Sequence, residues 1–554
     1  MENKFRNILL ISLLFFVLIL FSLSLFKNIS YPLLWNDEAE TAMFATRILE
    51  YGYPKVNDGK NVLNLLEHED KSLGVKQKYD AFKDAIWGQY YFAVPAVLLA
   101  HKVGDIYLKT ALIRIPFAAI GFLGLLIIVL PISKLFAQRL RKILFLILFF
   151  GLELFSISLI LHLRDARYHS LLIFLTGLIF YLYFQYYIFK KINFWIYTVL
   201  LSLFLLLVFN TFFPAYFPLL ITFALTSFFE SKTFNIKKKS RLNKEKFGFL
   251  IKQFLPLLIS FLITLPFFIF FEAFNTSKEI SKLYHFNFQR YLENLCYFLR
   301  FFNKYEFLTF ALVIKSILIL LTWKLKKKTL KIRQMLRVSN TLSLFFVIYA
   351  LVISRSPLIY ERYFIVLQPI LTVIFLLDAF IIFQFKDLKQ AKNYFLFLMM
   401  VFLLITSDRL HKIYPFKSYF YELTHQYKGP LDFAIPYIKK TFLSHEDLVI
   451  ATNYEEFSFM YYLDCKVIIG QGGHNLSEDI KLKPDIIISR KGWRSVFPEE
   501  MDLLLKNSRY QKVSFPVYDY RVNNIPELYY PIFHLFKTRF AENPDEALDI
   551  YIKQ

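Results

Sequence analysis

The stretch WNDEAETA, residues 35–42, follows the first apolar segment, and the rest of the chain is interpreted around it. It places two adjacent carboxylates, Asp37 and Glu38, and a third at Glu40, where a hydrophobic helix should leave a bilayer. Charged side chains at that depth are costly unless water or a partner stabilises them, so they indicate a functional site by default. The simpler alternative is a solvated surface helix with an acidic first turn and with Asn36 or Asp37 as its cap. Spacing alone leaves both interpretations open.

The composition places the chain among multi-span membrane proteins. Of its 554 residues, 56% are hydrophobic and 19% aromatic, which leaves too little polar surface for a soluble protein of this size. The net charge of +23 could suggest nucleic acid, but the basic residues fall mostly in short clusters between apolar runs, as in cytoplasmic loops. We therefore expect membrane lipids, and no nucleic acid, as partners. The two cysteines, Cys296 and Cys465, are too few for a disulfide framework, and the sequence leaves open whether they pair.

Apolar runs of bilayer length predict about eleven membrane spans, beginning with an uncleaved helix at 8–26. If the N-terminus is cytoplasmic, the basic clusters fall on the inner side, whereas the short outer loops around Asp165, Asn210 and Arg355 carry few positive residues. This asymmetry predicts a multi-pass protein of the plasma (inner) membrane with an extracytoplasmic C-terminus. The remaining predicted spans are 113–133, 143–161, 169–189, 192–209, 214–230, 248–272, 307–323, 338–354, 363–385 and 394–407.

Two long segments would then lie outside the membrane, a first loop at 27–112 and a later one at 273–306. The first contains an aromatic patch between Trp87 and Phe92, which suits a helix in the headgroup layer. The apolar run at 91–103 is only about 13 residues long, so we expect an interfacial helix there rather than another span.

After Ser407 the composition changes to short β-branched runs between helix-like stretches. This pattern predicts a small soluble α/β domain with a largely parallel sheet. We therefore expect a transmembrane catalytic domain at 1–407 and an extracytoplasmic soluble domain at 408–554. The glycine-rich GQGG at 470–473 matches neither nucleotide fingerprint, which favours a tight turn over a phosphate cradle. The predicted strands lie at 447–452, 466–470 and 485–489, and the predicted helices at 431–442 and 498–508.

With this topology, three polar groups meet on one face of the membrane: the carboxylates after the first span, segment 164–169 and segment 355–363. A carboxylate near the sugar-carrying carbon of a lipid-linked substrate could deprotonate an incoming hydroxyl as a general base. Asp37 is the better candidate for that base, with Glu38 or Asp165 orienting or completing the site.

Arginines in the same outer loops indicate an anionic partner. Arginine donates bidentately to phosphate oxygens, so Arg362, with Arg167, would hold the phosphate of a lipid-linked substrate at headgroup depth. Lysines of the later long loop add positive groups, although they could equally face anionic lipid headgroups. The alternative is local, with Arg164 paired to Asp165 and Arg362 to Glu361. The candidate donor-phosphate-binding residues are Arg164, Arg167, Lys278, Lys282, Arg362 and Tyr363.

This arrangement resembles the GT-C superfamily of polyprenyl-phosphate-dependent glycosyltransferases, in particular the protein O-mannosyltransferases and the aminoarabinose transferases that modify lipid A. The resemblance covers about residues 1–410, and it implies that Asp37 matches the catalytic acidic position and Asp165 a second acidic position. It also implies an inverting transferase that moves a sugar from a polyprenyl phosphate to a lipid, glycan or protein of the cell envelope, with undecaprenyl phosphate as the expected bacterial carrier. The stretches that carry the resemblance are 35–42, 45–54, 164–168 and 361–369.

Two other function classes remain open. A transporter or flippase of lipid-linked sugars also needs many spans, but no clear internal repeat is present and the conspicuous intramembrane charges are only Glu153 and Asp378. A polysaccharide polymerase or ligase is chemically close but normally lacks a carboxylate pair after the first span. The carboxylates could also hold a divalent metal ion, although no ligand set is legible.

Overall fold

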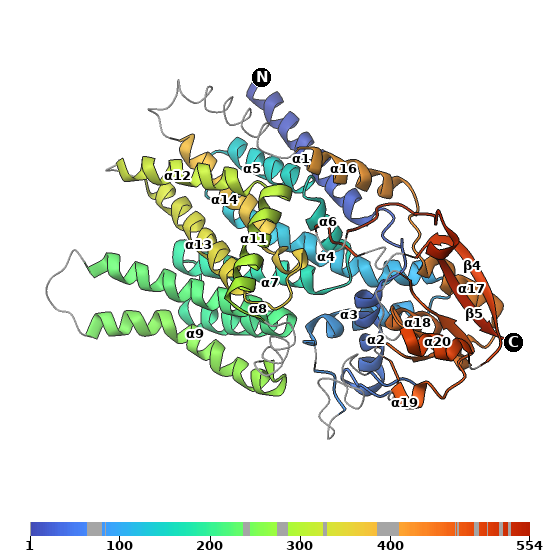
Figure 1. The fold of residues 1–554 in the computed structure, drawn as a ribbon. Helices are drawn as coiled ribbons and strands as arrows, with labels where there is room; N and C mark the ends of the chain where they lie inside the picture. The colour runs from blue at the N-terminus through green and yellow to red at the C-terminus, as the bar shows by residue number, and fades with distance from the viewer. Residues whose placement is uncertain are drawn as a thin grey trace. The chain divides into compact units, whose positions relative to one another are not determined.

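A computed structural model of the chain divides into two compact units, each assembled from separate stretches of sequence (Figure 1). The first unit comprises Met1–Leu25, Ala119–Leu163 and Tyr168–Phe416, and the second comprises Phe26–Ala118, Arg164–Arg167 and Lys417–Gln554. The division predicted at residues 407 and 408 stays a prediction. The structure describes residues 2–63, 80–83, 85–235, 244–273, 286–324, 329–384, 409–470, 472–473, 476–491, 498–506, 508–519, 525–529 and 533–554.

The first unit is helical. Helix α4 begins in the second unit, which contains its residues up to Ala118, and α6 ends at the boundary between the units. The elements are α1 (Glu2–Phe26), α4 (Ile106–Ser133), α5 (Arg139–Glu153), α6 (Ile157–Arg164), α7 (Tyr168–Tyr183), the π-helix η1 (Phe184–Ile188), α8 (Phe194–Asn235), α9 (Lys244–Phe270), α11 (Phe288–Tyr305), α12 (Leu308–Lys324), α13 (Leu330–Ile353), the 3-10 helix η2 (Glu361–Phe364) and α14 (Leu367–Ile382).

Within the described residues, five helices are long and apolar enough to cross a membrane, or seven if each of two bent helix pairs forms one span. Several helices of span length agree with the prediction of a multi-span chain, but the predicted number of eleven is not confirmed. The bent pairs are α5 with α6 and α11 with α12. The five helices are Phe5–Phe26, Ile106–Ser133, Tyr168–Ile188, Phe194–Phe229 and Leu330–Ile353.

The difference from eleven has identifiable causes. The two spans predicted at 192–209 and 214–230 both lie in α8, which is counted once although it consists of two helices joined at a kink at Phe212, between the predicted spans. Of α9 and α14, only the stretches Phe254–Phe270 and Leu367–Ile382 enter this count, and both have fewer than 18 residues. The last predicted span, 394–407, lies outside the described residues.

Helix α4 begins earlier than predicted, because its N-terminus is capped by an aspartate. The Asp105 carboxylate accepts hydrogen bonds from the backbone N–H groups of Tyr107 at 2.8 Å and Leu108 at 3.4 Å. Such caps satisfy donors that have no partner inside the helix. The predicted first loop, 27–112, therefore ends near residue 105 and already contains two helices, α2 (Asn36–Tyr51) and α3 (Gly88–Ala100).

Within the first unit, α8 packs against α7, α9 and α13, and α14 packs against α5, α12 and α13. A glycine allows α4 and α7 to approach closely: a Cβ atom on Gly124 would lie 2.8 Å from the backbone of Phe174. Small residues at such contacts are typical of helix pairs in membranes. Asp378, expected from the sequence to lie within the membrane, is paired with Lys315 at 3.2 Å and accepts a hydrogen bond from Ser339 at 2.5 Å.

The second unit contains α2, α3 and the mixed α/β region of the C-terminal part. Helix α3 packs against α2 and is 13 residues long, as expected for the short apolar helix of the first loop. The other elements are α16 (Arg409–Thr424, from Lys417 on), α17 (Leu431–Thr441), the 3-10 helix η4 (His445–Asp447), β1 (Val449–Thr452), α18 (Glu456–Leu463), β2 (Lys466–Ile468), α19 (Leu476–Asp479), β3 (Ile486–Ile488), α20 (Pro498–Lys506), β4 (Tyr510–Tyr518), the 3-10 helix η5 (Pro544–Glu546) and β5 (Ala547–Lys553).

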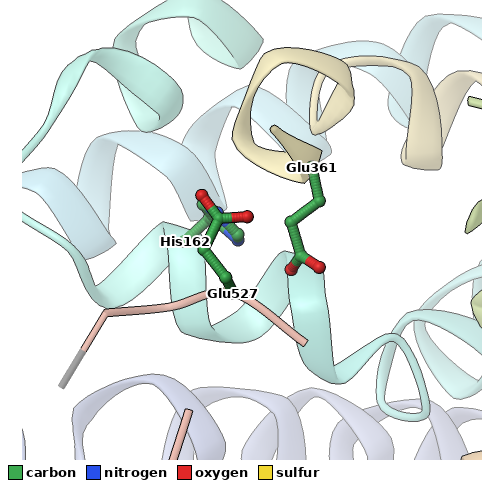
Figure 2. Close-up of side chains that lie close together, drawn as sticks. All are labelled: His162, Glu361 and Glu527. Atoms are coloured by element: carbon green, nitrogen blue, oxygen red, sulfur yellow. The ribbon is translucent and has the colours of Figure 1, made fainter. Parts of the chain in front are cut away.

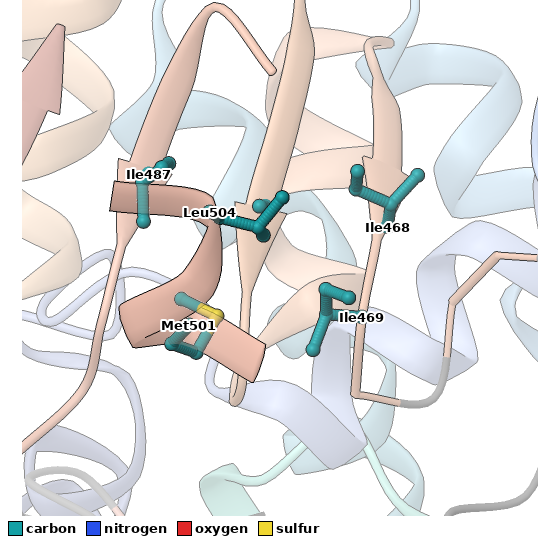
Figure 3. Close-up of a cluster of buried hydrophobic side chains, with 6 residues drawn as sticks. Ile468, Ile469, Ile487, Met501 and Leu504 are labelled. Atoms are coloured by element: carbon teal, nitrogen blue, oxygen red, sulfur yellow. The ribbon is translucent and has the colours of Figure 1, made fainter. Parts of the chain in front are cut away.

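The sheet has the strand order β2-β1-β3-β5-β4. Strands β1, β2 and β3 are parallel, as the buried β-branched runs predict, whereas β4 and β5 form an antiparallel extension. One face of the parallel part packs against α20 through a cluster of buried side chains (Figure 3). The cluster contains Ala451, Ile468, Ile469, Ile487, Met501 and Leu504.

The first loop adds to the edge of this sheet next to β2. The Asn61 amide donates to the carbonyl of Cys465 at 3.0 Å and accepts from the N–H of Val467 at 2.8 Å. Gly473 donates its N–H to the carbonyl of Val62 at 2.9 Å. An otherwise unpaired edge is therefore covered by a segment about 400 residues earlier in the chain.

Candidate functional site

The carboxylates predicted to be catalytic lie in the first turn of α2. The backbone of Trp35 caps this helix without a side-chain hydrogen bond, so the predicted cap at Asn36 or Asp37 is wrong. Acidic residues in a first turn are favoured by the helix dipole. Solvation does not explain them, however, because the side chain of Glu38 is only 1% exposed. The solvated surface helix considered from the sequence therefore does not fit Glu38.

Glu38 is held by an arginine that sequence reasoning missed. Arg114, on α4, donates to the two oxygens of Glu38 at 2.7 Å and 2.5 Å. The same guanidinium donates to the carbonyls of Ile29 at 3.0 Å and Pro32 at 2.7 Å, in the segment before α2. Burial raises the pKa of Glu38 to about 7, although Arg114 lowers it. The signal in the sequence was an arginine inside an apolar run, which requires an anionic partner.

Asp165 completes the buried end of the cluster. Its carboxylate accepts a hydrogen bond from the indole N–H of Trp35 at 3.2 Å and is hydrogen-bonded to Glu38. The backbone N–H of Ala166 also donates to Glu38, at 2.9 Å. Burial raises the pKa of Asp165, as it does that of Glu38. Two buried carboxyl groups in contact favour a shared proton. Glu38 and Asp165 are therefore suited to hold neighbouring residues in place rather than to carry one negative charge each.

Arg167 organises the more exposed end. Its guanidinium lies 3.5 Å from the Asp37 carboxylate and 3.3 Å from that of Glu40, and it donates to the carbonyl of Asp37 at 3.0 Å. The Tyr90 hydroxyl, on α3, donates to Glu40. Burial raises the pKa of Glu40, and Arg167 lowers it. The Asp37 side chain is 25% exposed against 14% for Glu40, so Asp37 is the more accessible of the two carboxylates.

The structure thus brings together, within the second unit, three predicted catalytic residues and one predicted phosphate ligand. Asp37, Glu38, Asp165 and Arg167 form one network, although they come from α2 and from the loop after α6. Sequence reasoning assigned no role to Glu40 and placed Tyr90 only in an aromatic patch. The available signal for Tyr90 was a tyrosine in the apolar helix that follows the acidic helix in the first loop.

Arg164 pairs with Glu422 rather than with Asp165, the local partner considered from the sequence. Its guanidinium donates to the Tyr419 hydroxyl at 2.5 Å and to the carbonyl of Lys27 at 3.1 Å, and it lies 3.8 Å from Glu422. Glu422 in turn contacts His534 at 2.7 Å. These contacts connect the 164–167 loop to α16, and the donor-phosphate role of Arg164 stays a prediction.

The remaining predicted ligands lie elsewhere. Arg362 and Tyr363 belong to the first unit, where the guanidinium of Arg362 lies 4.6 Å from the ring centre of Tyr360 and the carbonyl of Tyr363 accepts from Tyr349 at 2.7 Å. Their neighbour Glu361 accepts a hydrogen bond from Ser158 at 2.9 Å. Lys278 and Lys282 lie outside the described residues.

Figure 2 shows two polar side chains of the first unit near this segment, His162 on α6 and Glu361 at the start of η2. A ring nitrogen of His162 lies 2.8 Å from the carbonyl of Ser158, the residue whose hydroxyl donates to Glu361. Glu527, also drawn in Figure 2, belongs to the second unit.

A divalent ion does not fit the accessible carboxylates as they stand. Oxygen ligands of the kind offered by Asp37 and Glu40 suit Mg²⁺ or Mn²⁺. The guanidinium of Arg167, however, lies within 3.5 Å of both carboxylates and already provides their cation. Glu38 is likewise occupied by Arg114. The network is therefore built around arginines.

Comparisons with known proteins identify the fold. The sequence matches no protein-family profile and no curated protein. The structure is similar to that of ArnT from Cupriavidus metallidurans bound to undecaprenyl phosphate, with a TM-score of 0.54 and 11% identity over 98% of this chain and 97% of that chain. It is also similar to ArnT from the same organism in the apo state, with a TM-score of 0.53 and 10% identity over 100% of this chain and 98% of that chain. The chain therefore has the fold of ArnT over its whole length, which confirms, for the fold, the predicted resemblance to the aminoarabinose transferases.

Proposed function

We propose that the chain is a polyprenyl-phosphate-dependent glycosyltransferase of the GT-C type with Asp37 as its general base. The observation that carries the proposal is the position of Asp37. This carboxylate is 25% exposed at the edge of a network whose other predicted catalytic carboxyls, Glu38 and Asp165, are buried. A base must reach its substrate, and a buried network can hold it in place. The ArnT fold supports the same reaction class.

In the proposed reaction, Asp37 accepts the proton of an acceptor hydroxyl while the hydroxyl oxygen bonds to the anomeric carbon of the donor sugar. The bond between that carbon and the phosphate oxygen breaks, and polyprenyl phosphate leaves with the electron pair. Attack from the side opposite the phosphate inverts the configuration. An acceptor that is itself a phosphate would need no base, and Asp37 would then position groups instead.

We assign the donor phosphate first to Arg167. Its side chain is 13% exposed, and it is the guanidinium in direct contact with the proposed base. An arginine there can offer donors to phosphate oxygens while it still contacts a carboxylate, because its planar head carries five N–H groups. Arg362, Tyr363, Lys278 and Lys282 remain proposed ligands of the same phosphate. Arg164 would instead fix the loop that carries Arg167, since it is buried against Tyr419 and Glu422.

The partners follow from this assignment. The solved ArnT structure contains undecaprenyl phosphate, and we propose the same class of carrier for this chain. The acceptor would be a lipid, glycan or protein of the cell envelope on the extracytoplasmic face. Hydrophobic helices of span length support a membrane location, and the distribution of basic loops supports a cytoplasmic N-terminus.

A transporter of lipid-linked sugars is the competing function. The buried pair of Lys315 and Asp378 is the observation that favours it, because ion pairs between spans often line transport pathways. A polymerase or ligase differs from our proposal in its acceptor, which would be a growing polysaccharide. Both alternatives can be separated by following the labelled sugar.

The test is transfer from a panel of radiolabelled polyprenyl-phosphate sugars to envelope material in proteoliposomes. Asp37→Asn should reduce transfer by about 10²- to 10⁴-fold, the usual contribution of a general base. Asp464→Asn is the matched control, because Asp464 is a surface carboxylate of the same unit with 73% exposure. Full activity of Asp37→Asn would exclude Asp37 as the base. Movement of label across the bilayer without transfer would indicate a transporter.

A further inference from the structure

The carboxyl end of the parallel sheet has the topology of a ligand-binding edge. From β1 the chain passes through α18 to β2 on one side, whereas β3 lies on the other side of β1 and the chain continues from it to β4. The strand order therefore reverses between β1 and β3. In open α/β sheets, ligands bind outside the carboxyl ends of the strands at such a switch point.

The two strand ends are fixed to each other by a buried polar network. The N–H of Arg490, after β3, donates to the side-chain oxygen of Asn453, after β1, at 2.8 Å. The guanidinium of Arg490 pairs with Asp519 at 2.6 Å and with Glu455. Glu455 has a φ of 64°, a left-handed conformation that reverses the chain directly after Tyr454. The position of Tyr454 is thus determined by ion pairs on the residue that follows it.

Tyr454 lies beside the proposed base. Its ring packs against the buried pair Trp35 and Ile525, and Trp35 is two residues before Asp37. The charge of Asp37 contributes to the raised pKa of Tyr454, after burial and the charge of Glu455. As a residue, Tyr454 is partly exposed, whereas its neighbours Asn453 and Glu455 are buried.

Helix α18, which follows this turn, is fixed to the start of α2. The N–H of Phe457 donates to the Asn36 side chain at 3.4 Å, and the hydroxyl of Ser458 donates to the carbonyl of Leu34 at 3.0 Å. The N–H of Leu34 donates to the Tyr462 hydroxyl at 3.0 Å. These contacts bracket the residues from Leu34 to Asn36, so the switch point and Asp37 form one continuous site within the second unit.

The charges at this edge favour a neutral ligand. Among the described residues, the strand ends carry the acidic residues Glu455, Glu456 and Asp519, and Arg490 pairs with Glu455 and Asp519. An anionic group brought here would meet an excess of negative charge, and like charges brought together are costly. An aromatic ring beside carboxylates suits instead a molecule with an apolar face and several hydroxyl donors. A neutral sugar ring has this chemistry.

We propose that the sheet edge at the carboxyl ends of β1 and β3 is the acceptor subsite. There the ring of Tyr454 stacks on a neutral sugar, so that a hydroxyl of that sugar reaches Asp37. The delivery to Asp37 rests on the proposed function, whereas the binding of a neutral glycan does not. The acceptor would accordingly be a glycan or the sugar portion of a glycolipid.

The test measures glycan binding to the full-length protein in nanodiscs by saturation-transfer difference NMR. The probes are the neutral trisaccharides maltotriose, mannotriose and chitotriose, and trigalacturonic acid as an anionic counterpart. Tyr454→Ala should weaken binding of the preferred neutral trisaccharide at least tenfold, and Tyr454→Phe should retain it within about threefold, because the ring remains. Tyr437→Ala is the matched control, since Tyr437 packs its ring against Phe515 in the same unit.

Binding of undecaprenyl phosphate, measured on the same samples, separates the two proposals. Its retention in Tyr454→Ala together with loss of trisaccharide binding supports the subsite. Its absence from the wild-type protein would contradict the proposed function and leave the glycan subsite intact. The subsite is overturned if the wild-type protein binds none of the neutral trisaccharides, or if it binds trigalacturonic acid more tightly than any of them. It is also overturned if Tyr454→Ala binds the neutral trisaccharides unchanged, or if Tyr454→Phe loses binding as well.

Discussion

Replacement of Arg114 by methionine should destabilise the protein more than any substitution on its surface. The methionine removes two hydrogen bonds to Glu38 and two to the carbonyls of Ile29 and Pro32. Removing one partner of a buried ion pair costs about 3–5 kcal/mol, because the other charge stays buried without compensation. Replacing both partners costs less, so the double variant Arg114→Met, Glu38→Leu should recover part of the stability.

The loss of stability in Arg114→Met should also depend on pH. Burial raises the pKa of Glu38 from 4.5 to about 7 in the folded protein, so the folded state binds this proton more tightly than the unfolded state does. The stability contributed by the proton is complete below pH 4.5 and is lost as the pH rises through about 7. Without Arg114 the ionised form is penalised further. Arg114→Met should therefore be more destabilising at pH 8 than at pH 5.5.

The assay is thermal unfolding of the purified protein in detergent, followed by tryptophan fluorescence at one scan rate and at both pH values. Lys109→Met is the control, because Lys109 is a partly exposed basic residue on the same helix. Equal shifts in apparent Tm for Arg114→Met and Lys109→Met would refute the reasoning. So would a double variant that is no more stable than Arg114→Met, or a loss that does not grow between pH 5.5 and pH 8.

Three further predictions use the same measurement. Arg490→Met should lower stability by about 3–5 kcal/mol, since it leaves buried carboxylates at the sheet edge without their cation; an unchanged Tm would contradict that network. Lys315→Met should destabilise similarly through Asp378, and Lys315→Met combined with Asp378→Leu should restore stability; failure of the double variant to do so would mean that the pair is not isolated. Gly124→Ala should cost about 1–3 kcal/mol by overpacking against Phe174, and a neutral result would show that α4 and α7 can separate without cost.

The sequence predicted the parts of the fold that follow from local pattern. Apolar runs identified most of the membrane helices, because a bilayer demands length and hydrophobicity within one segment. Buried β-branched runs identified β1, β2 and β3. Strands β4 and β5 were not predicted: β4 has a largely exposed face and a proline at 516, and its pairing with β5 shifts register between Phe515 and Tyr518. Such a strand carries a weak signal until its partner is known.

The predicted number of eleven spans is not confirmed, for a related reason. Hydropathy gives no information on whether a long apolar stretch bends, and the structure bends α5 against α6 by 80° and α11 against α12 by 91°. Phe212 interrupts α8 in a stretch that was divided into two spans. These bends depend on the helices packed alongside, which the hydropathy of the bent segment does not specify.

By itself, the sequence determined that this is a membrane protein with an acidic helix start after its first span and a parallel sheet near its C-terminus. Only the tertiary structure decided which carboxylate is buried with Arg114, which is exposed beside Arg167, and which strand ends lie next to them. The partners of Glu38 are 76 and 128 residues away in the chain, and those of Asn36 are more than 400 residues away. Local pattern fixes which residues can form a helix or strand, whereas the burial and pairing of charges depend on contacts between segments that are distant in sequence.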